Sequence, residues 1–344
     1  MKTTSATTDF DQRYQTHLKP VTYGSNRRPV AKRENVLMTP NLAPAFAPLT
    51  GLYEPSAIQQ LPDGRFLVVE DEKDHSFSLL TLSASGAVSH KSLGPGWFHG
   101  GDPIWKLDDL EGLTLDGLGH LYAITSHSRN DDGDEQKGRE KLARFRIEQD
   151  RVIEPVVVGG LKRALVAAHP VLAAAAQVLD AKSGAGLNIE ALEITPDGQR
   201  LLIGFRSPLQ GSQAIIASVE NPVAIFDSDA APQISKPLQT LDLGGHGIRG
   251  MSYVAALNGY LIISGPASRA DHAFGLWFWS GQADAPARRI TVPGLAGFER
   301  AEGVCPAVID GVSKILIVSD DGNRKQGRFA RFVLLDMAQL QIAA

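Results

Sequence analysis

A short phrase recurs five times along the chain, each time placing a small residue, and in four copies a charged residue, inside an apolar run. The copies read SAI, LEGL, IEAL, IRGM and AEGV, and they lie at Ser56–Ile58, Leu110–Leu113, Ile189–Leu192, Ile248–Met251 and Ala301–Val304. After each copy come a short turn and a strongly apolar segment that ends in polar residues. Self-similarity at a period of roughly 50 residues is typical of propellers and arrays. The repeats therefore favour one large repeat domain over a single-copy fold.

The strands expected within each repeat predict the blades of a propeller. In the first repeat the SAI phrase is followed by FLVVE, FSLLTL and AVSHKSL, which gives four short strands joined by tight turns. The third repeat offers two segments for its third strand, AIIASV and VAIFD. We therefore expect an all-β protein with a single β-propeller of five four-stranded blades. Six blades are the alternative, if the region between the second and third repeats contains another.

The two ends of the sequence predict how the ring of blades closes. Residues 1–34 are polar and predict a flexible arm, with localisation or partner binding as the alternative, and residues 35–344 form the predicted propeller domain. The fifth repeat lacks its outer strand. The segment Glu34–Thr39 (ENVLMT) is the candidate for that strand, because closure by the N-terminal segment removes two open sheet edges.

One helical insertion is expected around residues 160–182, between the second and third blades. The segment LKRALVAAHPVLAAAAQVLDA is rich in alanine, which favours helix. Pro170 lies inside it and predicts either the start of a second helix or a kink. We interpret the insertion as packing over the blades, with a lid as the alternative.

Composition limits the partners and the compartment. The 344 residues include 34 basic and 38 acidic ones, for a formal net charge of −4, which gives no general attraction to nucleic acid or to an anionic membrane. Cys305 is the only cysteine, so no intramolecular disulfide forms. No run of about 18 apolar residues and no secretory signal is present, which predicts a cytoplasmic protein. The expected partner is a small molecule or another protein.

The charged residue of the repeated phrase carries the functional hypothesis. In a propeller the first strand of each blade lines the central channel, so Glu111, Glu190, Arg249 and Glu302 are expected to meet near one channel mouth. Carboxylates brought this close need compensation from a cation, an internal arginine or raised pKa values. Arg249 offers one form of compensation. Another is Ca²⁺ bound by the three glutamates, because Ca²⁺ takes six to eight oxygen ligands. The alternative is structural, with each glutamate locking its blade to the next.

Polar residues at the ends of the second strands add to this site. Equivalent loops of a propeller gather on one face, and here they carry His127, Arg129, Arg206, Asp320 and Asp321. Arginine side chains suit phosphate or carboxylate groups, and acidic clusters suit a hard cation. The histidine is a candidate base or ligand, with a structural hydrogen-bonding role as the alternative.

Several longer segments resemble a bacterial family known as domain of unknown function 3616. They are DDLEGL, ITSHSR, NIEAL, GFRSPL, GGHGIRGM, SGP, LWFWSG, AEGV and VSDDG, in this order, between about residues 50 and 335. The resemblance implies a β-propeller and no established activity. A more distant likeness to phytase-like and gluconolactonase-like propellers implies that channel carboxylates hold calcium or another divalent ion. The third phrase departs mildly, with Ala191 where the other glutamate phrases have glycine.

Together these features predict a small-molecule site at the channel mouth that binds an anionic or polyol ligand with a divalent cation. Its catalytic form is hydrolysis of a phosphoester, ester or lactone, in which a carboxylate or metal-bound water activates the nucleophile. The candidate catalytic residues are Glu111, Glu190, Glu302 and His127. The candidate ligand-binding residues are Arg129, Arg206, Arg249, Asp320 and Asp321. The rival hypothesis is a non-catalytic scaffold whose loop face binds another protein, so whether the chain is an enzyme stays open.

Overall fold

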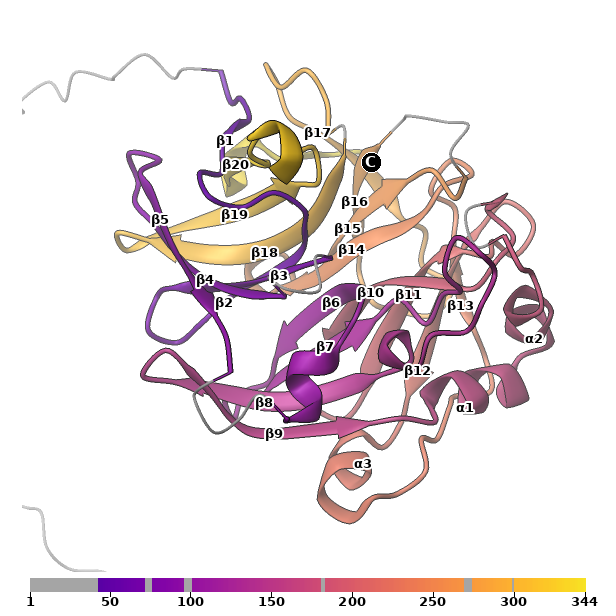
Figure 1. Ribbon diagram of the computed structural model, residues 1–344. Coiled ribbons are helices and arrows are strands. Elements are labelled where there is room, and N and C mark those ends of the chain that lie inside the picture. Colours follow the sequence, from indigo (N-terminus) through magenta and orange to yellow (C-terminus); the bar gives the residue numbers. More distant parts are fainter. Residues whose placement is uncertain (1–42, 72–75, 96–100, 181–182, 269–273, 299) are drawn as a thin grey trace, which may run out of the picture. The chain divides into compact units, whose positions relative to one another are not determined.

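The computed structural model describes residues 43–71, 76–95, 101–180, 183–268, 274–298 and 300–344. Ala43–Ala344 form one compact unit, in which the strands make five antiparallel sheets arranged around a common centre (Figure 1). Four sheets have four strands, and the fourth sheet along the chain has a fifth strand at its outer edge. The predicted all-β class and the five-bladed propeller are therefore confirmed.

The strands of each blade follow one another from the inner edge outwards. Blade one contains β2 (Pro55–Gln60), β3 (Phe66–Glu70), β4 (Phe77–Leu82) and β5 (Val88–Leu93). Blade two contains β6 (Leu110–Leu115), β7 (Leu121–Thr125), β8 (Leu142–Glu148) and β9 (Arg151–Val158). Blade three contains β10 (Asn188–Ile194), β11 (Leu201–Ser207), β12 (Ala214–Val219) and β13 (Gln239–Leu241).

The last two blades complete the ring. Blade four contains β14 (Gly247–Val254), β15 (Gly259–Gly265), β16 (Gly275–Trp279) and β17 (Arg288–Thr291), to which β21 (Gln341–Ile342) adds a fifth strand. Blade five contains β18 (Ala301–Ile309), β19 (Val312–Ser319) and β20 (Arg331–Asp336), with β1 (Ala47–Pro48) as its outer strand. The inner strands β2, β6, β10, β14 and β18 each lie beside the inner strands of both neighbouring blades.

The N-terminal part of the compact unit closes the ring, as the missing strand of the fifth repeat predicted. Strand β1 pairs with β20 through Ala47 opposite Phe332 and Pro48 opposite Arg331. The backbone N–H of Leu49 then donates to the carbonyl of Ala330 at 2.7 Å. The predicted closing segment, Glu34–Thr39, lies outside the described residues.

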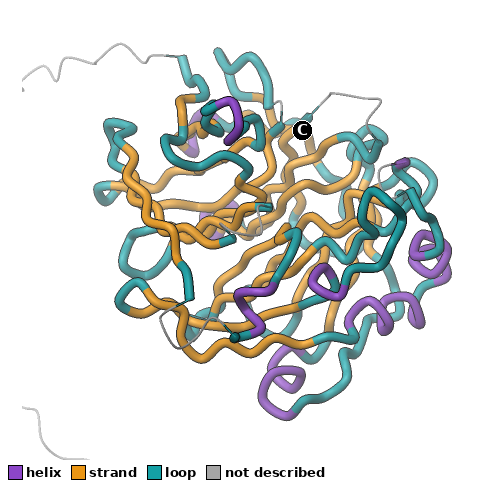
Figure 2. The backbone as a smooth tube through the Cα atoms, in the orientation of Figure 1, coloured by secondary structure: helices purple, strands orange, loops and turns teal. Residues whose placement is uncertain are grey.

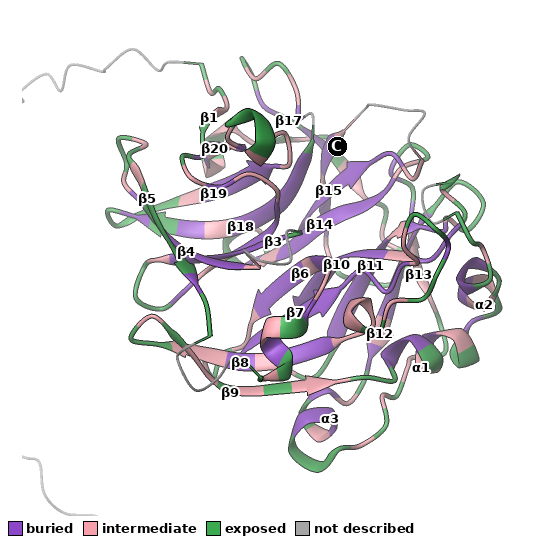
Figure 3. Cartoon of the chain, viewed as in Figure 1, coloured by how far each residue is buried: buried purple, intermediate pink, exposed green. Residues whose placement is uncertain are grey.

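Apolar side chains fill the spaces between successive blades. Strands β3, β7 and β15 are buried along their whole length, because each is covered on both faces by a neighbouring blade (Figure 3). This explains why the second strand of each repeat is a continuous apolar run rather than an alternating one. Among the described residues, five clusters of buried apolar side chains occur, one for each contact between blades.

Helices are few and lie at the periphery of the strands (Figure 2). The predicted insertion forms α1 (Leu161–Ala168) and α2 (Pro170–Ala176), and Pro170 does begin the second helix. Buried Leu165 and Leu172 join the apolar cluster between blades two and three, so the insertion packs on the blades. The segment VAIFD lies in a third helix, α3 (Pro222–Ser228), and AIIASV is strand β12. Within the described residues, no helix is long and apolar enough to span a membrane.

Candidate functional site at the channel mouth

A β-bulge occupies the same place in all five inner strands. In each case the pairing with the second strand skips one residue, and a bulge of this kind re-aims the side chain of the extra residue. The skipped residues are Ser56, Glu111, Glu190, Arg249 and Glu302. The predicted ring of equivalent charged positions on the inner strands is thereby confirmed, with serine in the blade-one position.

The small residue that follows each bulge is required by the close approach of the next blade. A Cβ atom at Gly250 would overlap the carbonyl oxygen of Glu302, and one at Gly112 would lie 2.8 Å from the backbone nitrogen of Leu192. Ala191 breaks the glycine pattern in blade three. Its Cβ fits because Gly204 lies directly beside it on β11.

The channel enclosed by this ring is narrow. Its cavity is lined by the bulge residues Ser56, Glu111, Glu190 and Glu302 and their neighbours, and has a volume of about 10 Å³. That volume holds about one water molecule. A ligand larger than a single ion or water would therefore have to lie above the ring, at the mouth formed by the surrounding loops.

Arg249 neutralises two of the three glutamates. Its Nε lies 2.8 Å from Oε2 of Glu190, and its Nη2 forms an ion pair with Oε1 of Glu302. Arg206 approaches Glu190 from the next strand, with Nη1 3.1 Å from Oε1, and the side-chain amide of Asn188 donates to the same oxygen at 3.0 Å. Glu190, Arg249 and Glu302 are all at least nine-tenths buried. The internal arginine is thus the compensation that the structure uses for these two carboxylates.

Glu111 is different, because its charge has no direct partner. No described residue donates a hydrogen bond to its carboxyl group or forms an ion pair with it. Burial raises the pKa of Glu111 well above its usual range, and the negative charges of Glu190, Asp109 and Asp71 raise it further. The attraction of Arg249 opposes this effect only in part. The carboxyl group of Glu111 therefore favours its neutral form more strongly than an ordinary glutamate does, and it lies within the ring next to the mouth.

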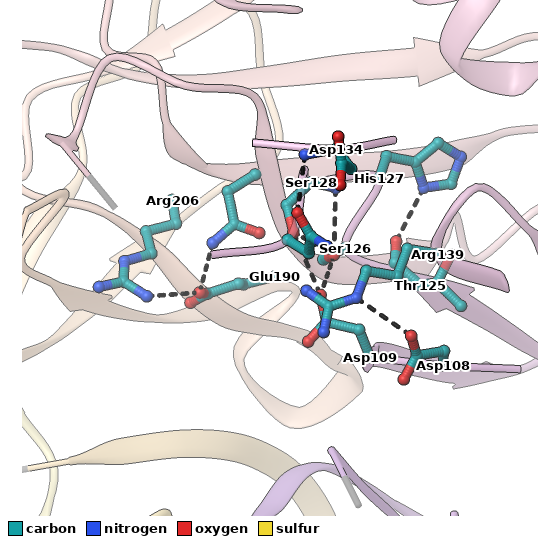
Figure 4. Close-up of polar contacts among 12 residues, drawn as sticks. Asp108, Asp109, Thr125, Ser126, His127, Ser128, Asp134, Arg139, Glu190 and Arg206 are labelled. Atoms are coloured by element: carbon teal, nitrogen blue, oxygen red, sulfur yellow. Dashed lines mark hydrogen bonds and ion pairs between the residues drawn. The ribbon is translucent and has the colours of Figure 1, made fainter. Parts of the chain in front are cut away.

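A second set of polar groups lies at the rim, around Asp109 (Figure 4). The Asp109 carboxylate accepts hydrogen bonds from the hydroxyl groups of Ser126 and Ser128, the latter at 3.2 Å, and pairs with Nη1 of Arg139 at 3.1 Å. Asp71 directly follows β3, and burial together with the negative charge of Asp109 raises its pKa to about 8. Neither aspartate is among the candidate site residues, although Asp109 immediately precedes the LEGL phrase and Asp71 immediately follows the FLVVE segment.

His127 and Arg129 do not join the glutamates, which corrects the expectation that the loop after β7 points both of them to the mouth. His127 has a positive φ of 57°, and its Nδ1 contacts the carbonyl of Thr125 at 2.8 Å. Its ring points away from Asp109 and is buried against α2 of the insertion (Figure 4). Burial lowers the pKa of His127 to about 4, so the ring is neutral. These contacts support the structural alternative.

Arg129 also contacts the insertion. Its guanidinium donates to the carbonyl of Gly133 at 2.9 Å and to that of Ala176 at 3.3 Å, and it pairs with Glu135. These partners tie the loop after β7 to the end of α2, away from the ring of glutamates.

The two aspartates after β19, Asp320 and Asp321, lie in different surroundings. Asp320 lies near Arg249, and burial raises its pKa to about 6 although the charge of Arg249 opposes the rise. Asp321 instead pairs with Arg331 and accepts a hydrogen bond from Ser319 at 2.7 Å. Asp320 therefore belongs to the channel mouth and Asp321 to the wall of blade five.

Half of the sequence matches a known protein family. Residues 163–336, half of the sequence, match the family described as "Protein of unknown function (DUF3616)". The chain belongs to this family. The DUF3616 match covers blades three to five, including Glu190, Arg206, Arg249 and Glu302, whereas Glu111 and Asp109 precede it. No curated protein matches the sequence.

Solved structures resemble the DUF3616 chain only distantly. A putative oxidoreductase (glucose dehydrogenase) from Thermus thermophilus is 16% identical, with 85% of this chain and 100% of that chain covered and a TM-score of 0.42. The PQQ-bound aldose sugar dehydrogenase of Streptomyces coelicolor is 15% identical, with 84% and 96% covered and a TM-score of 0.41. TolB from Acinetobacter baumannii is 14% identical with a TM-score of 0.36, and this chain spans 56% of its length. No conclusion about activity, cofactor or substrate follows from likeness at these values.

Proposed function

We propose that the protein binds a small anionic or polyol ligand at the channel mouth and hydrolyses a phosphoester, ester or lactone bond there, with Glu111 as the group that exchanges a proton. The observation that carries this proposal is the carboxyl group of Glu111, which is held in the ring and left without a hydrogen bond or ion pair among the described residues. Glu111 is partly exposed and lines the cavity of the ring, and a polar group without a protein partner at such a place is a candidate for contact with a ligand.

The chemistry follows from the different surroundings of two carboxyl groups. Glu190 pairs with two guanidinium groups, those of Arg206 and Arg249, whereas Glu111 has no such partner and its pKa is raised by burial. Neighbouring carboxyl groups in different protonation states are the arrangement used for acid–base catalysis. When water attacks the bond, Glu111 would donate its proton to the departing oxygen. The proton released by the attacking water would then restore the neutral carboxyl group.

The calcium form of this hypothesis stays a prediction. Two of the three predicted ligands, Glu190 and Glu302, face Arg249, which occupies the position where a cation would neutralise them. Among the described residues, no group of three or more histidine, cysteine, aspartate or glutamate side chains is placed to hold a metal ion. If Ca²⁺ binds, the melting temperature should rise with its concentration and fall with EDTA. A melting temperature that responds to neither contradicts the calcium hypothesis.

The scaffold hypothesis draws support from the same ring. The ion pairs of Arg249 join blades three, four and five, so Glu190 and Glu302 have a structural role whatever the ligand. A pure scaffold would give Glu111 no chemical role. The two hypotheses therefore differ in what happens when Glu111 alone is changed.

Hydrolysis of three chromogenic or titratable probes tests the proposal: p-nitrophenyl butyrate, p-nitrophenyl phosphate and glucono-δ-lactone. The Glu111→Gln variant keeps the shape of the side chain but cannot donate an acidic proton, so kcat should fall about 10²–10⁴-fold. Glu193→Gln is the matched control, since Glu193 is a buried glutamate of β10 outside the mouth. Equal activity in wild type and Glu111→Gln, or no hydrolysis of any probe by wild type, contradicts the proposed reaction.

A further inference from the structure

The small cavity within the ring, called the axial cavity below, is lined by two layers of side chains from the inner strands. The first layer consists of four bulge residues, Ser56, Glu111, Glu190 and Glu302. The second layer lies two positions further along each inner strand and is apolar: Ile58, Leu113, Leu192, Met251 and Val304. The inner strands run away from the mouth, because their first residues pair with the last residues of the second strands. The apolar layer therefore closes the cavity on the side away from the mouth.

Ser56 is a buried polar residue that lines this cavity without a protein partner. It is 3% exposed and occupies the blade-one position of the ring, where the pairing of β2 with β3 skips it. No described residue forms a hydrogen bond with its hydroxyl group. Buried hydroxyl groups are normally satisfied, either by the protein or by an ordered water molecule. A small polar molecule in the axial cavity would satisfy Ser56.

Two carboxyl groups that line the same cavity also have an oxygen atom without a partner. Glu302 forms its ion pair with Arg249 through Oε1, and no described residue donates a hydrogen bond to its Oε2. Glu111 has no hydrogen-bonding or ion-pair partner among these residues. Glu190 differs, because arginine nitrogens contact both of its oxygens. The hydroxyl group of Ser56, Oε2 of Glu302 and the carboxyl group of Glu111 are thus available to one occupant of the cavity.

The size of the axial cavity favours water as this occupant. Its volume of about 10 Å³ is that of a single water-sized sphere. An internal water molecule typically makes about three hydrogen bonds, which matches the three available groups, whereas Ca²⁺ takes about six to eight oxygen ligands. The reacting group of a ligand does not fit beside this water and has to lie above it, at the mouth. A water molecule in the cavity therefore lies between the apolar layer and a bound ligand.

We propose that the axial cavity holds the water molecule that attacks the ligand, with Ser56 orienting this water and Glu302 accepting its proton. A guanidinium favours the ionised form of an adjacent carboxyl group, and the ionised form accepts hydrogen bonds. As the water oxygen bonds to the carbon or phosphorus of the ligand, one water proton passes to Glu302, and Glu111 gives its proton to the oxygen that leaves. The next water to enter the cavity carries the proton of Glu302 to Glu111, so protons and electrons balance without a co-reactant. This inference rests on the proposed function and assigns its nucleophile.

The water site is tested by high-resolution crystal structures of the wild type and of Ser56→Val, in which methyl groups replace the hydroxyl group and fill part of the cavity. We expect one ordered water in the wild type, within hydrogen-bonding distance of Ser56 and Glu302, and its loss in Ser56→Val. Ser252→Ala is the matched control, because Ser252 is a buried serine of the inner strand β14 that does not line the cavity, and the water should persist. No water in the wild type, a metal ion in its place, or an unchanged water in Ser56→Val overturns the site.

The role of the water is tested with whichever of the three probes the wild type hydrolyses, in the presence of methanol as a second nucleophile. The wild type should form the hydrolysis product, because the cavity has no room for methanol. Ser56→Gly removes the side chain, so its ratio of methanol adduct to hydrolysis product should rise about tenfold or more. A loss of stability alone does not change this ratio.

Ser56→Ala keeps the cavity but removes the hydroxyl group that orients the water. Its kcat should fall about 10–100-fold with KM unchanged, whereas Ser252→Ala should match the wild type. An unchanged product ratio in Ser56→Gly, or an unchanged kcat in Ser56→Ala, overturns this inference alone, since the loss of activity in Glu111→Gln would still support the proposed function. No hydrolysis of any probe by the wild type overturns both.

Discussion

At the scale of single residues, the ring contains two glutamates that pair with an arginine and one that does not. Arg249 pairs with Glu190 and Glu302, whereas the pKa of Glu111 is raised by burial and by the neighbouring carboxylates. A buried ion pair adds little net stability, yet removing one partner leaves an uncompensated buried charge. Arg249 is therefore expected to be important for the stability of the fold.

These two ion pairs predict a large loss of stability in Arg249→Gln. Two buried carboxylates lose their cation, so the free energy of unfolding in urea at pH 7 should fall by about 3–5 kcal/mol. Arg206→Gln is the control. Its side chain is more exposed and Glu190 keeps Arg249, so we expect a loss of about 1 kcal/mol. Equal losses in the two variants would show that Arg249 is not the central partner of the ring.

At the scale of elements, the inner strands hold each other through buried polar groups. Glu193 of β10 accepts hydrogen bonds from Thr114 of β6 and from the backbone N–H of Tyr253 of β14, each at 2.9 Å. It thereby joins the inner strands of three blades. Burial raises the pKa of Glu193 to about 8, although both hydrogen bonds lower it. This is the locking role that the sequence suggested for channel glutamates, found at Glu193, three residues beyond the predicted Glu190.

Glu193 makes stability depend on pH. Between its ordinary pKa of 4.5 and the folded value of about 8, the unfolded chain releases the proton while the folded protein keeps it. The free energy of unfolding should therefore fall as the pH rises through this window, by at most about 5 kcal/mol in total from this group. Glu193→Gln keeps a neutral donor and acceptor, so its stability should change less with pH. Urea unfolding at pH 5, 6.5 and 8 measures the free energy of unfolding of both proteins. The same pH dependence in wild type and in Glu193→Gln would contradict this prediction.

Most of the elements were predictable from sequence, and the failures have local causes. Apolar runs between turns identified the inner and second strands, because both are buried on two faces. The choice between AIIASV and VAIFD was not settled by pattern, since a short apolar run fits either state. Pro222 decides it by beginning a helix. The bend at His127 reverses the expected direction of its side chain, because this residue has a positive φ that the sequence pattern does not mark.

At the scale of the whole molecule, ring closure joins the two ends of the compact unit. The sequence predicted closure by an N-terminal strand, but β1 has only two residues and includes a proline, so no pattern marks it. Leu49 and Leu52, which follow β1, are fully buried against blade five and blade one. Closure therefore combines a short strand with the burial of these two leucines.

Truncation tests the closure. A chain that begins at Ala43 retains β1 and should keep the melting temperature of the full protein. A chain that begins at Tyr53 loses β1, Leu49 and Leu52, and exposes the edge of β20. We expect it to melt at least several degrees lower and to associate through that edge. Equal melting temperatures for the two truncations would contradict closure by β1.

The titration of Glu111 decides whether the ring leaves one carboxyl group apart from its arginines to contact a ligand. It is measured by ¹³C NMR of protein labelled at the glutamate side-chain carboxyl carbons, with the resonance assigned by its loss in Glu111→Gln. We expect Glu111 to titrate well above the ordinary glutamate value, because burial and the neighbouring carboxylates oppose its ionisation. A resonance that titrates near the ordinary glutamate value of 4.5 would show that Glu111 is an ordinary carboxylate and contradict its role at the site.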